Sequence, residues 1–560
     1  MTIPGIIHAQ VAFISPLPFG ILQVHGDHAD LRLWVAVQGY STFSIKLSSD
    51  IDTSSLQSGW SSVTVRNDTV DTLITVPKSL RNYSIYWRTG LAANDTGGMI
   101  SGLTPGHIIG IAGQSNAQGF TWEMIVPAEG DIRMLPRNDS TWVPAHEPTG
   151  GAGGGPWIVM ANELYQRIGD TLPIGIVNAA IGSTALTTTS LSEPIWRRNP
   201  NNPEDTSLYG KALRLFRSAG SELECLGWIQ GEGDAGYMPN PNIYRVAFAN
   251  LMEGFHEDLT DTFPIFHLQI GGDNGAATDN WPAVREAERI LPPSILVGTA
   301  LGRSVDDGLH YSPPTMTAVG QMFAGALLKE RYGISTPMYP PLMPDSNAVL
   351  DSITDGSIVG HYCFSVRWFR NNLPTQIALL NPVQYFALQK DGSMMDTSQV
   401  WARISPSDPT RILIGLRNDS ITLNHDWRVT YDATSESDRA PLATVDPASG
   451  DTIFATAFYE LPVRLPPGTQ DGVKEFNVQF VEPNPTMNAI NCYILAFKHE
   501  TMTVELLDNL GAVLRSEMAV LEEGVQDIPI STDGLSSGNY WIELRDENGN
   551  ESLEKAIVVH

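Results

Sequence analysis

Positive charge is scarce in this chain of 560 residues. Lysine and arginine together number 34 against 62 aspartates and glutamates, so the formal net charge at pH 7 is -28. A surplus of negative charge opposes binding to nucleic acid and to anionic membrane surfaces. We therefore expect no nucleic-acid partner, and the acidity fits an extracellular or cell-surface protein.

Cysteines and long apolar runs are also few. Cys225, Cys363 and Cys492 are far apart and form no CxxC pair, so the sequence indicates neither a disulfide framework nor a zinc site. We expect no metal and no cofactor. No apolar run reaches the ~18 residues of a membrane-spanning helix, so we expect no membrane insertion.

The start, "MTIPGIIHAQVAF", is no complete signal peptide; it reads as a first strand or as the tail of a signal peptide cleaved after Ala9.

Changes in the pattern of apolar and polar residues along the chain indicate four expected domains. Residues 1–100 contain runs such as "LRLWVAV" and "YSIYWRT", which predict a small β-sandwich. The Gly-rich "AANDTGGMISGLTPG" reads as a connection to a domain at 106–335, and the Pro-rich "ISTPMYPPLMPDS" reads as a linker after it. Beyond the linker, short strands without a long helix predict two further all-β sandwich domains, at 348–470 and 480–560.

Strands and helices alternate in the second of these domains. The expected strands are "HIIGIAG", "LPIGIVNAA", "LECLGWIQG", "FPIFHLQIGG" and "SILVGTA". Helix-period segments lie between them, among them "PWIVMANELYQRIGD", "LYGKALRLFRS", "NIYRVAFANLMEGFHEDL" and "WPAVREAERIL". This alternation predicts a doubly wound parallel sheet with helices on both faces, an α/β domain of three layers.

Ligands of an open parallel sheet bind beyond the carboxyl ends of its strands, where this sequence places several polar residues. Ser115 follows the first expected strand and Gly182 the second, Gln230 follows the third, and Asp307 and His310 follow the fifth. Serine-dependent ester hydrolysis needs a hydroxyl activated by histidine, a carboxylate that orients the imidazole, and N–H groups aimed at the developing oxyanion. The collected residues include all of these parts.

The expected oxyanion donors follow from local backbone chemistry. Ser115 enters a helix, so its own N–H is available to an oxyanion at a positive helix end. Gly182 has no side chain to obstruct its N–H. Gln230 or Asn116 adds a side-chain donor.

Four ordered segments, "GQSNAQG", "IGIVNAAIGSTAL", "GWIQGEGDA" and "DDGLHYS", resemble the blocks of SGNH (GDSL-like) hydrolases. Within that group they are similar to the branch of sialate O-acetylesterases and plant-type acetylxylan esterases of the sixth carbohydrate esterase family. The resemblance covers about residues 106–333. It implies that Ser115 is the nucleophile, His310 the general base, Asp307 its carboxylate partner and Gly182 an oxyanion donor.

The third block departs from the wider superfamily, which has Gly-x-Asn-Asp there with the asparagine as an oxyanion donor. This chain has "QGEGD", and similarity to the "QGES" of the acetylesterase branch points to Gln230 as the substitute donor. We expect Glu232 to organise its neighbours, with Asn116 and Asp234 as further supporting residues. Asp306 competes with Asp307 for the carboxylate role, and the Asp-x-x-His spacing favours Asp307.

The C-terminal stretch from "MTVELLDNLGAVL" through "GLSSGNYWIEL" to "KAIVVH" resembles the sorting domain of proteins exported by the type IX secretion system of Bacteroidetes. This resemblance implies secretion machinery as a partner and an extracellular or cell-surface location. A plain adhesive or spacer domain is the alternative, because short strands distinguish sandwich families weakly.

The function expected from these features is a serine-dependent carbohydrate O-acetylesterase that acts on acetylated oligo- or polysaccharides through an acetyl-Ser115 intermediate. The alternatives are a lipase-like esterase, a phage virion or surface-attached receptor-binding protein with a deacetylating domain, and a non-catalytic carbohydrate-binding module. The tryptophans Trp122, Trp142, Trp157 and Trp196 are assigned no role, since most tryptophans are core residues.

Overall fold

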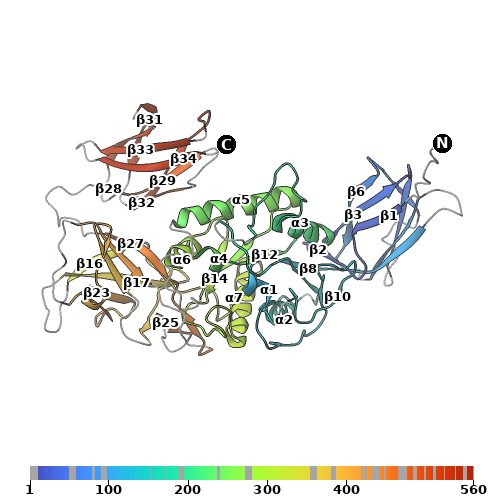
Figure 1. The fold of residues 1–560 in the computed structure, drawn as a ribbon, viewed down its shortest axis with the longest axis horizontal. Coiled ribbons are helices and arrows are strands. Elements are labelled where there is room, and N and C mark those ends of the chain that lie inside the picture. The colour runs from blue at the N-terminus through green and yellow to red at the C-terminus, as the bar shows by residue number, and fades with distance from the viewer. Residues whose placement is uncertain are drawn as a thin grey trace. The chain divides into compact units, whose positions relative to one another are not determined.

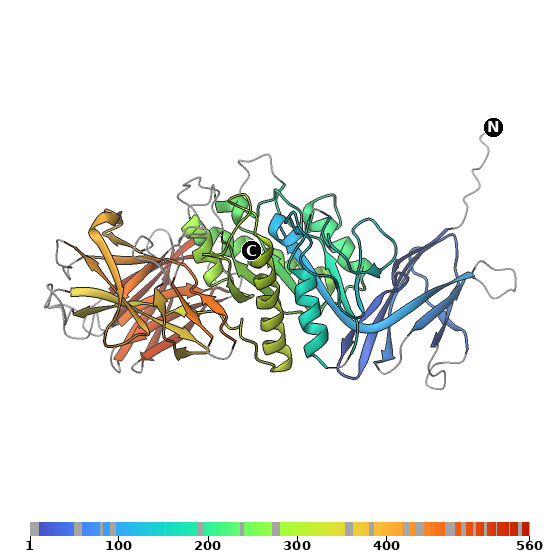
Figure 2. The same cartoon turned by 90° about the horizontal axis from the view of Figure 1, so that it is seen from below.

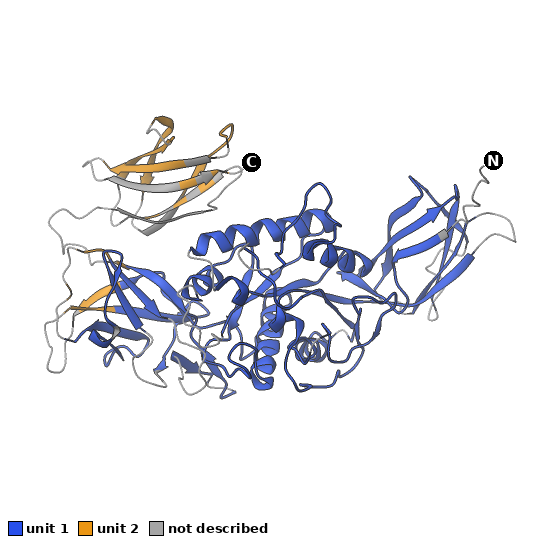
Figure 3. Ribbon diagram, in the orientation of Figure 1, with its two compact units in different colours: residues 1–348, 365–418, 427–462 blue, residues 349–364, 419–426, 463–560 orange. Residues whose placement is uncertain are grey.

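The computed structural model of the protein is multidomain and mostly β. Its described residues are 10–49, 59–78, 82–89, 97–151, 153–169, 171–187, 194–235, 240–271, 281–352, 362–379, 386–417, 421, 425–431, 442–446, 449–464, 476–482, 489–496, 500–508, 512–521, 524–536, 538–546 and 551–558. The chain divides into two compact units, coloured in Figure 3. Unit 1 comprises 1–348, 365–418 and 427–462, and unit 2 comprises 349–364, 419–426 and 463–560.

The N-terminal part of unit 1 consists of antiparallel strands around an apolar core (Figure 1). In the strand β3 (His28–Gln38), buried and half-buried residues alternate, as expected when one face of a sheet packs on a core. The other strands of this part are β1 (Gln10–Ser15), β2 (Ile21–His25), β4 (Phe43–Ser49), β5 (Ser61–Val63), β6 (Thr69–Pro77) and β7 (Tyr83–Arg88).

One long strand, β8 (Gly97–Gly113), runs from this part into the next (Figure 2). Its first half pairs with β7, for example Met99 with Tyr86, and its second half pairs with β11 and β12. The expectation of a Gly-rich connection is therefore wrong from Gly97 onward. Pairing with β7, and then with β2 at residues 104–106, supplies partners for the backbone groups and holds this stretch extended.

The central sheet has the strand order β9-β11-β8-β12-β13-β14, and all neighbours in it are parallel. Every residue of β11, β12 and β13 is buried, because both faces of the sheet are covered. The five strands expected from the sequence are present, as part of β8 and as the four strands β11 (Ile174–Asn178), β12 (Cys225–Ile229), β13 (Ile265–Gln269) and β14 (Ile295–Thr299). The sequence analysis missed the short strands β9 (Ile132–Met134) and β10 (Val143–Pro144).

Helices cover this sheet. Helix α2 packs on α7, which also contacts β13 and β14, while α5 packs on α3 and α6. Figure 1 shows α3 and α5 on one side of the strands and α2 and α7 on the other. The helices of this region are α1 (Ser115–Gln118), α2 (Trp157–Arg167), α3 (Leu208–Ser218), α4 (Glu232–Ala235), α5 (Pro241–Leu259), α6 (Trp281–Arg289) and α7 (Pro313–Tyr332).

The ends of α7 follow its sequence signals. Ser312 precedes the first turn with extended backbone, and Pro313 occupies the first helical position, where its missing N–H costs nothing. Gly333 ends the helix with φ 70°, in the left-handed region that glycine tolerates. The start of this helix therefore fixes the end of the loop that carries His310.

The Pro-rich stretch after α7 is packed rather than free. Met338, Tyr339 and Leu342 are buried, and the Tyr339 hydroxyl donates to Glu330 on α7. The expectation of a linker is therefore wrong for these residues, because three apolar side chains in a short span gain more from burial than from hydration.

Short strands without a long helix follow, as expected. They are β15 (Met343–Pro344), β16 (Ala348–Ser352), β17 (Tyr362–Arg370), β18 (Leu373–Pro374), β19 (Ala378–Leu379), β20 (Phe386–Lys390), β21 (Ser393–Met394), β22 (Val400–Ile404), β23 (Arg411–Leu416), β24 (Trp427–Tyr431), β25 (Leu442–Val445), β26 (Thr452–Phe454) and β27 (Phe458–Arg464). A single turn of 3₁₀ helix, Thr397–Gln399, lies among them.

The C-terminal part of unit 2 contains two antiparallel sheets, ordered β28-β29-β32 and β31-β30-β33-β34. Ile494 from the first sheet and Leu506 and Ile542 from the second belong to one buried apolar cluster, so the two sheets share a core. The strands are β28 (Phe476–Glu482), β29 (Ala489–Ala496), β30 (Glu500–Leu507), β31 (Val513–Leu521), β32 (Gly524–Ser531), β33 (Gly538–Asp546) and β34 (Glu551–Val558).

Candidate active site

Ser115 is the first residue of α1, directly beyond the carboxyl end of β8. The turn between strand and helix depends on Gly113, whose φ is 129°. A Cβ atom on Gly113 would lie 2.1 Å from the carbonyl oxygen of Ile229 in the neighbouring strand, so a larger residue does not fit without backbone movement. The close approach of β8 and β12 therefore sets the position of the Ser115 hydroxyl.

The structure brings Ser115, His310 and Asp307 together. His310 Nε2 lies 3.0 Å from Ser115 Oγ, and His310 Nδ1 lies 2.6 Å from Asp307 Oδ2. The two ring nitrogens thus face a hydroxyl on one side and a carboxylate on the other. This is the arrangement in which a histidine takes a proton from a serine while a carboxylate holds the reacting tautomer.

The surroundings of Asp307 favour its ionised form. Burial acts to raise its pKa, but hydrogen bonds from the His310 ring and from the backbone N–H groups of His310 and Leu309 outweigh burial and hold the pKa below its usual value. Asp306 contributes its backbone N–H to the His310 carbonyl, and no hydrogen bond joins its carboxylate to the His310 ring. Of the two neighbouring aspartates, the structure places Asp307 against the imidazole.

Asn116 connects the turn at Ser115 to the loop of His310. Its Oδ1 accepts from the Tyr311 N–H at 3.0 Å, and its Nδ2 donates to Glu232 Oε1 at 2.6 Å and to the Leu309 carbonyl at 3.3 Å. Burial raises the pKa of Glu232 despite the hydrogen bond from Asn116. The fully buried Asn116 therefore holds the segments on both sides of His310.

Gly182 lies next to Ser115. A Cβ atom on it would lie 3.4 Å from Ser115 Cβ. Its N–H donates to Gln118 Oε1 at 2.7 Å, and Gln118 Nε2 donates to the Gly150 carbonyl at 3.1 Å. The sequence analysis did not single out Gln118, although it lies in the "GQSNAQG" motif at one helical turn from Ser115.

Gln230 is completely buried, and protein partners engage both ends of its amide. Its Nε2 lies 2.6 Å from Asp234 Oδ2 and 3.2 Å from Gln114 Oε1, and its Oε1 accepts from the Tyr244 hydroxyl at 2.8 Å. Asp234 also accepts from the backbone N–H groups of Leu186 and Thr187. This network joins the segments after β11 and β12 beneath the serine.

Phe120 is a second residue that sequence reasoning missed. Its ring stacks on the His310 imidazole, with the centroids 4.0 Å apart and the planes inclined by 24°. The only signal for it in the sequence is its position, directly after the "GQSNAQG" motif. Stacking on an aromatic face favours a positively charged imidazole.

Trp142, Trp157 and Trp196 are buried, which agrees with the core role typical of tryptophan. Trp122 differs: 84% of its surface is exposed, and its ring lies 6.5 Å from that of Phe120 in an edge contact.

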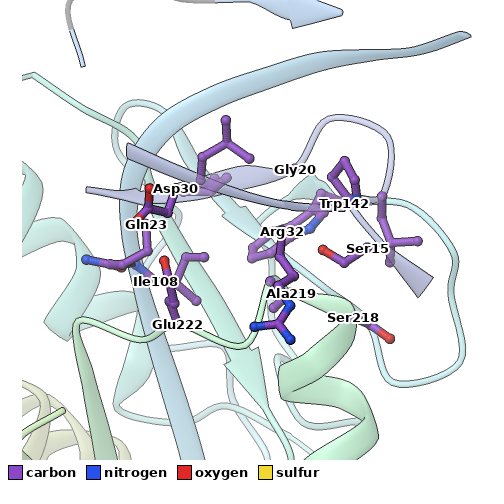
Figure 4. A pocket seen from close by; sticks show the side chains of 15 residues that line it. Ser15, Gly20, Gln23, Asp30, Arg32, Ile108, Trp142, Ser218, Ala219 and Glu222 are labelled. Carbon is purple, nitrogen blue, oxygen red and sulfur yellow. Dashed lines mark hydrogen bonds between the residues drawn. The ribbon is translucent and has the colours of Figure 1, made fainter. Parts of the chain in front are cut away.

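One pocket and one group of possible metal ligands in unit 1 lie apart from Ser115, His310 and Asp307. A pocket between β2, β3 and the end of α3 includes Asp30, Trp142 and Glu222 and none of the residues proposed for catalysis (Figure 4). Beside it, His25, Asp30 and Glu222 place ligand atoms within 4.8 Å of one another, a grouping able to hold a cation. His25 Nε2 is 3.2 Å from Glu222 Oε2, and this hydrogen bond raises the pKa of His25.

A serine, a histidine and an aspartate beyond the carboxyl ends of parallel strands are typical of hydrolases. Residues 105–329 match the family model described as "Carbohydrate esterase, sialic acid-specific acetylesterase", and residues 481–560 match the "Secretion system C-terminal sorting domain". The chain therefore carries a carbohydrate esterase domain and a C-terminal sorting domain. The sorting domain marks a secreted or cell-surface protein.

A carbohydrate acetylesterase from Xanthomonas citri has a similar solved structure, with a TM-score of 0.58 and 16% identity, covering 80% of this chain and 99% of that chain. At this identity the likeness shows a shared fold. A protein from Arabidopsis thaliana is 27% identical, with a TM-score of 0.34, covering 40% of this chain and 99% of its own. No curated protein sequence matches this chain. None of the described helices has the length and apolar character needed to cross a bilayer.

Proposed function

We propose that the protein is a serine-dependent carbohydrate O-acetylesterase that releases acetate from acetylated oligo- or polysaccharides. The observation that carries this proposal is the chain of contacts from Ser115 Oγ through His310 to Asp307, at 3.0 Å and 2.6 Å. The esterase family match over residues 105–329 supplies the substrate class.

In the proposed reaction, His310 Nε2 takes the Ser115 proton as Oγ attacks the acetyl carbonyl carbon. The tetrahedral intermediate collapses when His310 returns the proton to the sugar oxygen, and the sugar leaves as its hydroxyl form. Water then attacks the acetyl-serine while His310 takes its proton, and acetate is released as His310 returns that proton to Ser115 Oγ. Asp307 stays ionised throughout and stabilises the imidazolium.

The oxyanion is assigned to the backbone N–H groups of Ser115 and Gly182. The first N–H groups of a helix have no acceptor within it, so the Ser115 N–H is directed away from α1. The Gly182 N–H reaches the oxyanion when it releases Gln118 Oε1. Gln230 and Asn116 remain candidates for a third donor, although each has to give up an existing bond to Asp234 or Glu232.

We infer that the central domain is a three-layer SGNH hydrolase with a doubly wound sheet and that the flanking domains are β-sandwiches. The parallel strand order and the helices on both sides of the sheet support the first assignment. The core shared by two antiparallel sheets supports the second for residues 476–558.

The test of the proposed function is acetate release from 4-nitrophenyl acetate and acetylated xylan, in the presence of a metal chelator. Ser115→Ala removes the covalent step, so we expect it to lose nearly all turnover while keeping its melting temperature. Ser218→Ala is the matched control, because this serine lies at the end of α3 beside the pocket of Figure 4. Hydrolysis that survives in Ser115→Ala contradicts the mechanism. A preference for long acyl chains assigns a lipase-like esterase instead.

We also propose that residues 481–560 engage the secretion machinery. The matching sorting-domain family supports this, and no comparison favours a virion location. Fusing these residues to an exported reporter tests it in a host with type IX secretion. The reporter is expected at the cell surface or in the medium, and retention in the periplasm contradicts the assignment.

A further inference from the structure

The segment just after α1 presents an unusual surface beside the proposed nucleophile. Trp122 is 84% exposed and Met124 is 76% exposed, and no other large apolar side chain of the described residues exceeds Trp122 in exposure. The next two tryptophans along the chain, Trp142 and Trp157, are buried. Exposure of the apolar indole surface to water is unfavourable. A partner that covers this ring is therefore expected.

This segment is fixed on both sides of the exposed ring. Thr121 exchanges backbone hydrogen bonds with Gly154, at 3.2 Å and 3.1 Å, and the Ile125 N–H donates to Glu147 Oε2 at 2.8 Å. The Thr121 hydroxyl also donates to the Glu123 carbonyl at 2.6 Å. A ring carried on such a backbone loses little conformational freedom on binding, which favours affinity.

Two ring contacts connect Trp122 to the proposed catalytic histidine. Its ring meets that of Phe120 edge-on at 6.5 Å, and Phe120 stacks on His310 at 4.0 Å. His310 in turn is 3.0 Å from Ser115 Oγ. A sugar ring placed on the indole therefore lies next to the position where an acetyl ester meets the serine.

Two carboxylate residues lie against His310: Asp307 Oδ2 is 2.6 Å from its Nδ1, and Asp306 donates its backbone N–H to the His310 carbonyl at 2.8 Å. Asp306 has a raised pKa because of its burial and because of Asp307 and Glu123, and only His310 acts in the opposite direction. Glu123 is the direct neighbour of Trp122. Two arginines of the domain are engaged elsewhere: Arg303 lies over the ring of Phe454, and Arg285 is buried and donates to the Ile270 carbonyl.

We propose that Trp122 is a stacking platform for an uncharged pyranose ring of an acetylated polysaccharide, and that the protein prefers such neutral substrates to O-acetylated sialic acids. This inference rests on the proposed esterase function. The faces of a pyranose ring carry C–H groups that pack on an aromatic ring while the hydroxyls at its rim stay hydrated. A sialic acid carries a carboxylate, which the cluster of Glu123, Asp306 and Asp307 repels. The preference departs from the sialic acid named in the matching family's description.

The test compares wild type with Trp122→Ala, Trp122→Phe and Trp60→Ala on acetylated xylan and on 4-nitrophenyl acetate. Trp60 is the matched control, an exposed tryptophan of the N-terminal part that lies under Arg88. We expect Trp122→Ala to raise KM for acetylated xylan about tenfold, the loss common for a truncated aromatic anchor, with kcat nearly unchanged. Trp122→Phe retains most of the affinity. The rate on 4-nitrophenyl acetate, which has no sugar to stack, stays the same.

An equal loss on both substrates in Trp122→Ala overturns the platform, because it shows that the ring only supports the catalytic residues. A wild-type preference for O-acetylated sialic acid over acetylated xylan overturns the neutral substrate class.

Binding of acetylated xylan by Ser115→Ala, with and without Trp122→Ala, separates this inference from the proposed function. Weaker binding in the double variant supports the platform even where the wild type hydrolyses no ester. Unchanged binding in the double variant overturns it.

Discussion

The ring of Phe120 lies nearly parallel to the imidazole of His310, with 4.0 Å between the ring centroids. The same imidazole contacts Ser115 and Asp307 through its two nitrogens. The histidine is therefore held at both edges and on one face, and the stacked face gives its charged form a favourable environment.

Replacing Phe120 by leucine keeps apolar bulk but removes the aromatic face. Because the imidazolium forms only during the reaction, we expect kcat to fall about tenfold with little change in KM for 4-nitrophenyl acetate. Phe120→Tyr restores the rate, since it keeps the ring. Equal rates for the leucine variant and wild type contradict a role for the stacking.

Asp307→Asn tests which aspartate orients His310. An amide in this position favours the wrong histidine tautomer, so we expect kcat to fall by roughly 10⁴-fold while the fold is kept. Asp306→Asn is the neighbouring control and is expected to stay within about threefold of wild type, since its carboxylate makes no hydrogen bond to the ring. The reverse order of effects assigns the carboxylate role to Asp306.

Gln118→Glu tests the assignment of Gly182 as an oxyanion donor. A carboxylate 2.7 Å from the Gly182 N–H holds this group more strongly and repels the developing oxyanion. We expect kcat to fall by about 100-fold, the size of effect seen when an oxyanion donor is lost, with KM nearly unchanged. Steady-state kinetics on 4-nitrophenyl acetate measure it. A wild-type kcat removes Gly182 from the oxyanion site.

Glu224 makes the stability of unit 1 sensitive to acid. Its carboxylate accepts from Gln23 on β2, His107 on β8 and Tyr332 on α7, at 2.7 to 3.1 Å. Burial acts to raise the pKa of Glu224, but the hydrogen bond and charge of His107, the charge of Arg331 and the hydrogen bond of Tyr332 hold it at about 2, below the ordinary 4.5. A carboxyl with a lower pKa in the folded protein stabilises the fold above pH 4.5, and this contribution is lost as the pH falls towards 2.

The expected loss across that window is up to roughly 3 kcal/mol of the free energy of unfolding. Urea unfolding of wild type and Glu224→Gln between pH 5 and pH 3 measures the part of this loss that falls above pH 3, and the variant is expected to show the weaker dependence on pH. Glu163→Gln, at the exposed pair with Arg167, is the control and should follow wild type. Parallel curves for wild type and Glu224→Gln contradict this account.

Local patterns in the sequence predicted much of the fold. Largely apolar runs predicted β11, β12 and β13, because strands buried on both faces need no alternation. Ser312 and Pro313 are typical of a helix start and Gly333 of a helix end, and they bound α7. The same reasoning failed at Gly97, where glycines suggested a connection but pairing with β7 continues the strand. Strand pairing depends on a partner elsewhere in the chain, and a local window does not contain that partner.

The sequence by itself determined that Ser115 follows a buried strand and that Asp307 and His310 share one loop, because strand ends and a three-residue spacing are local properties. Only the tertiary structure decided that this loop meets Ser115 across 195 positions of sequence, through the order of the parallel strands. The tertiary structure also determined that Gln230 bonds to Asp234 and Tyr244 and that Trp122 is exposed. A buried amide takes whatever polar partners the fold brings to it, and the exposure of an indole depends on which distant segments cover it.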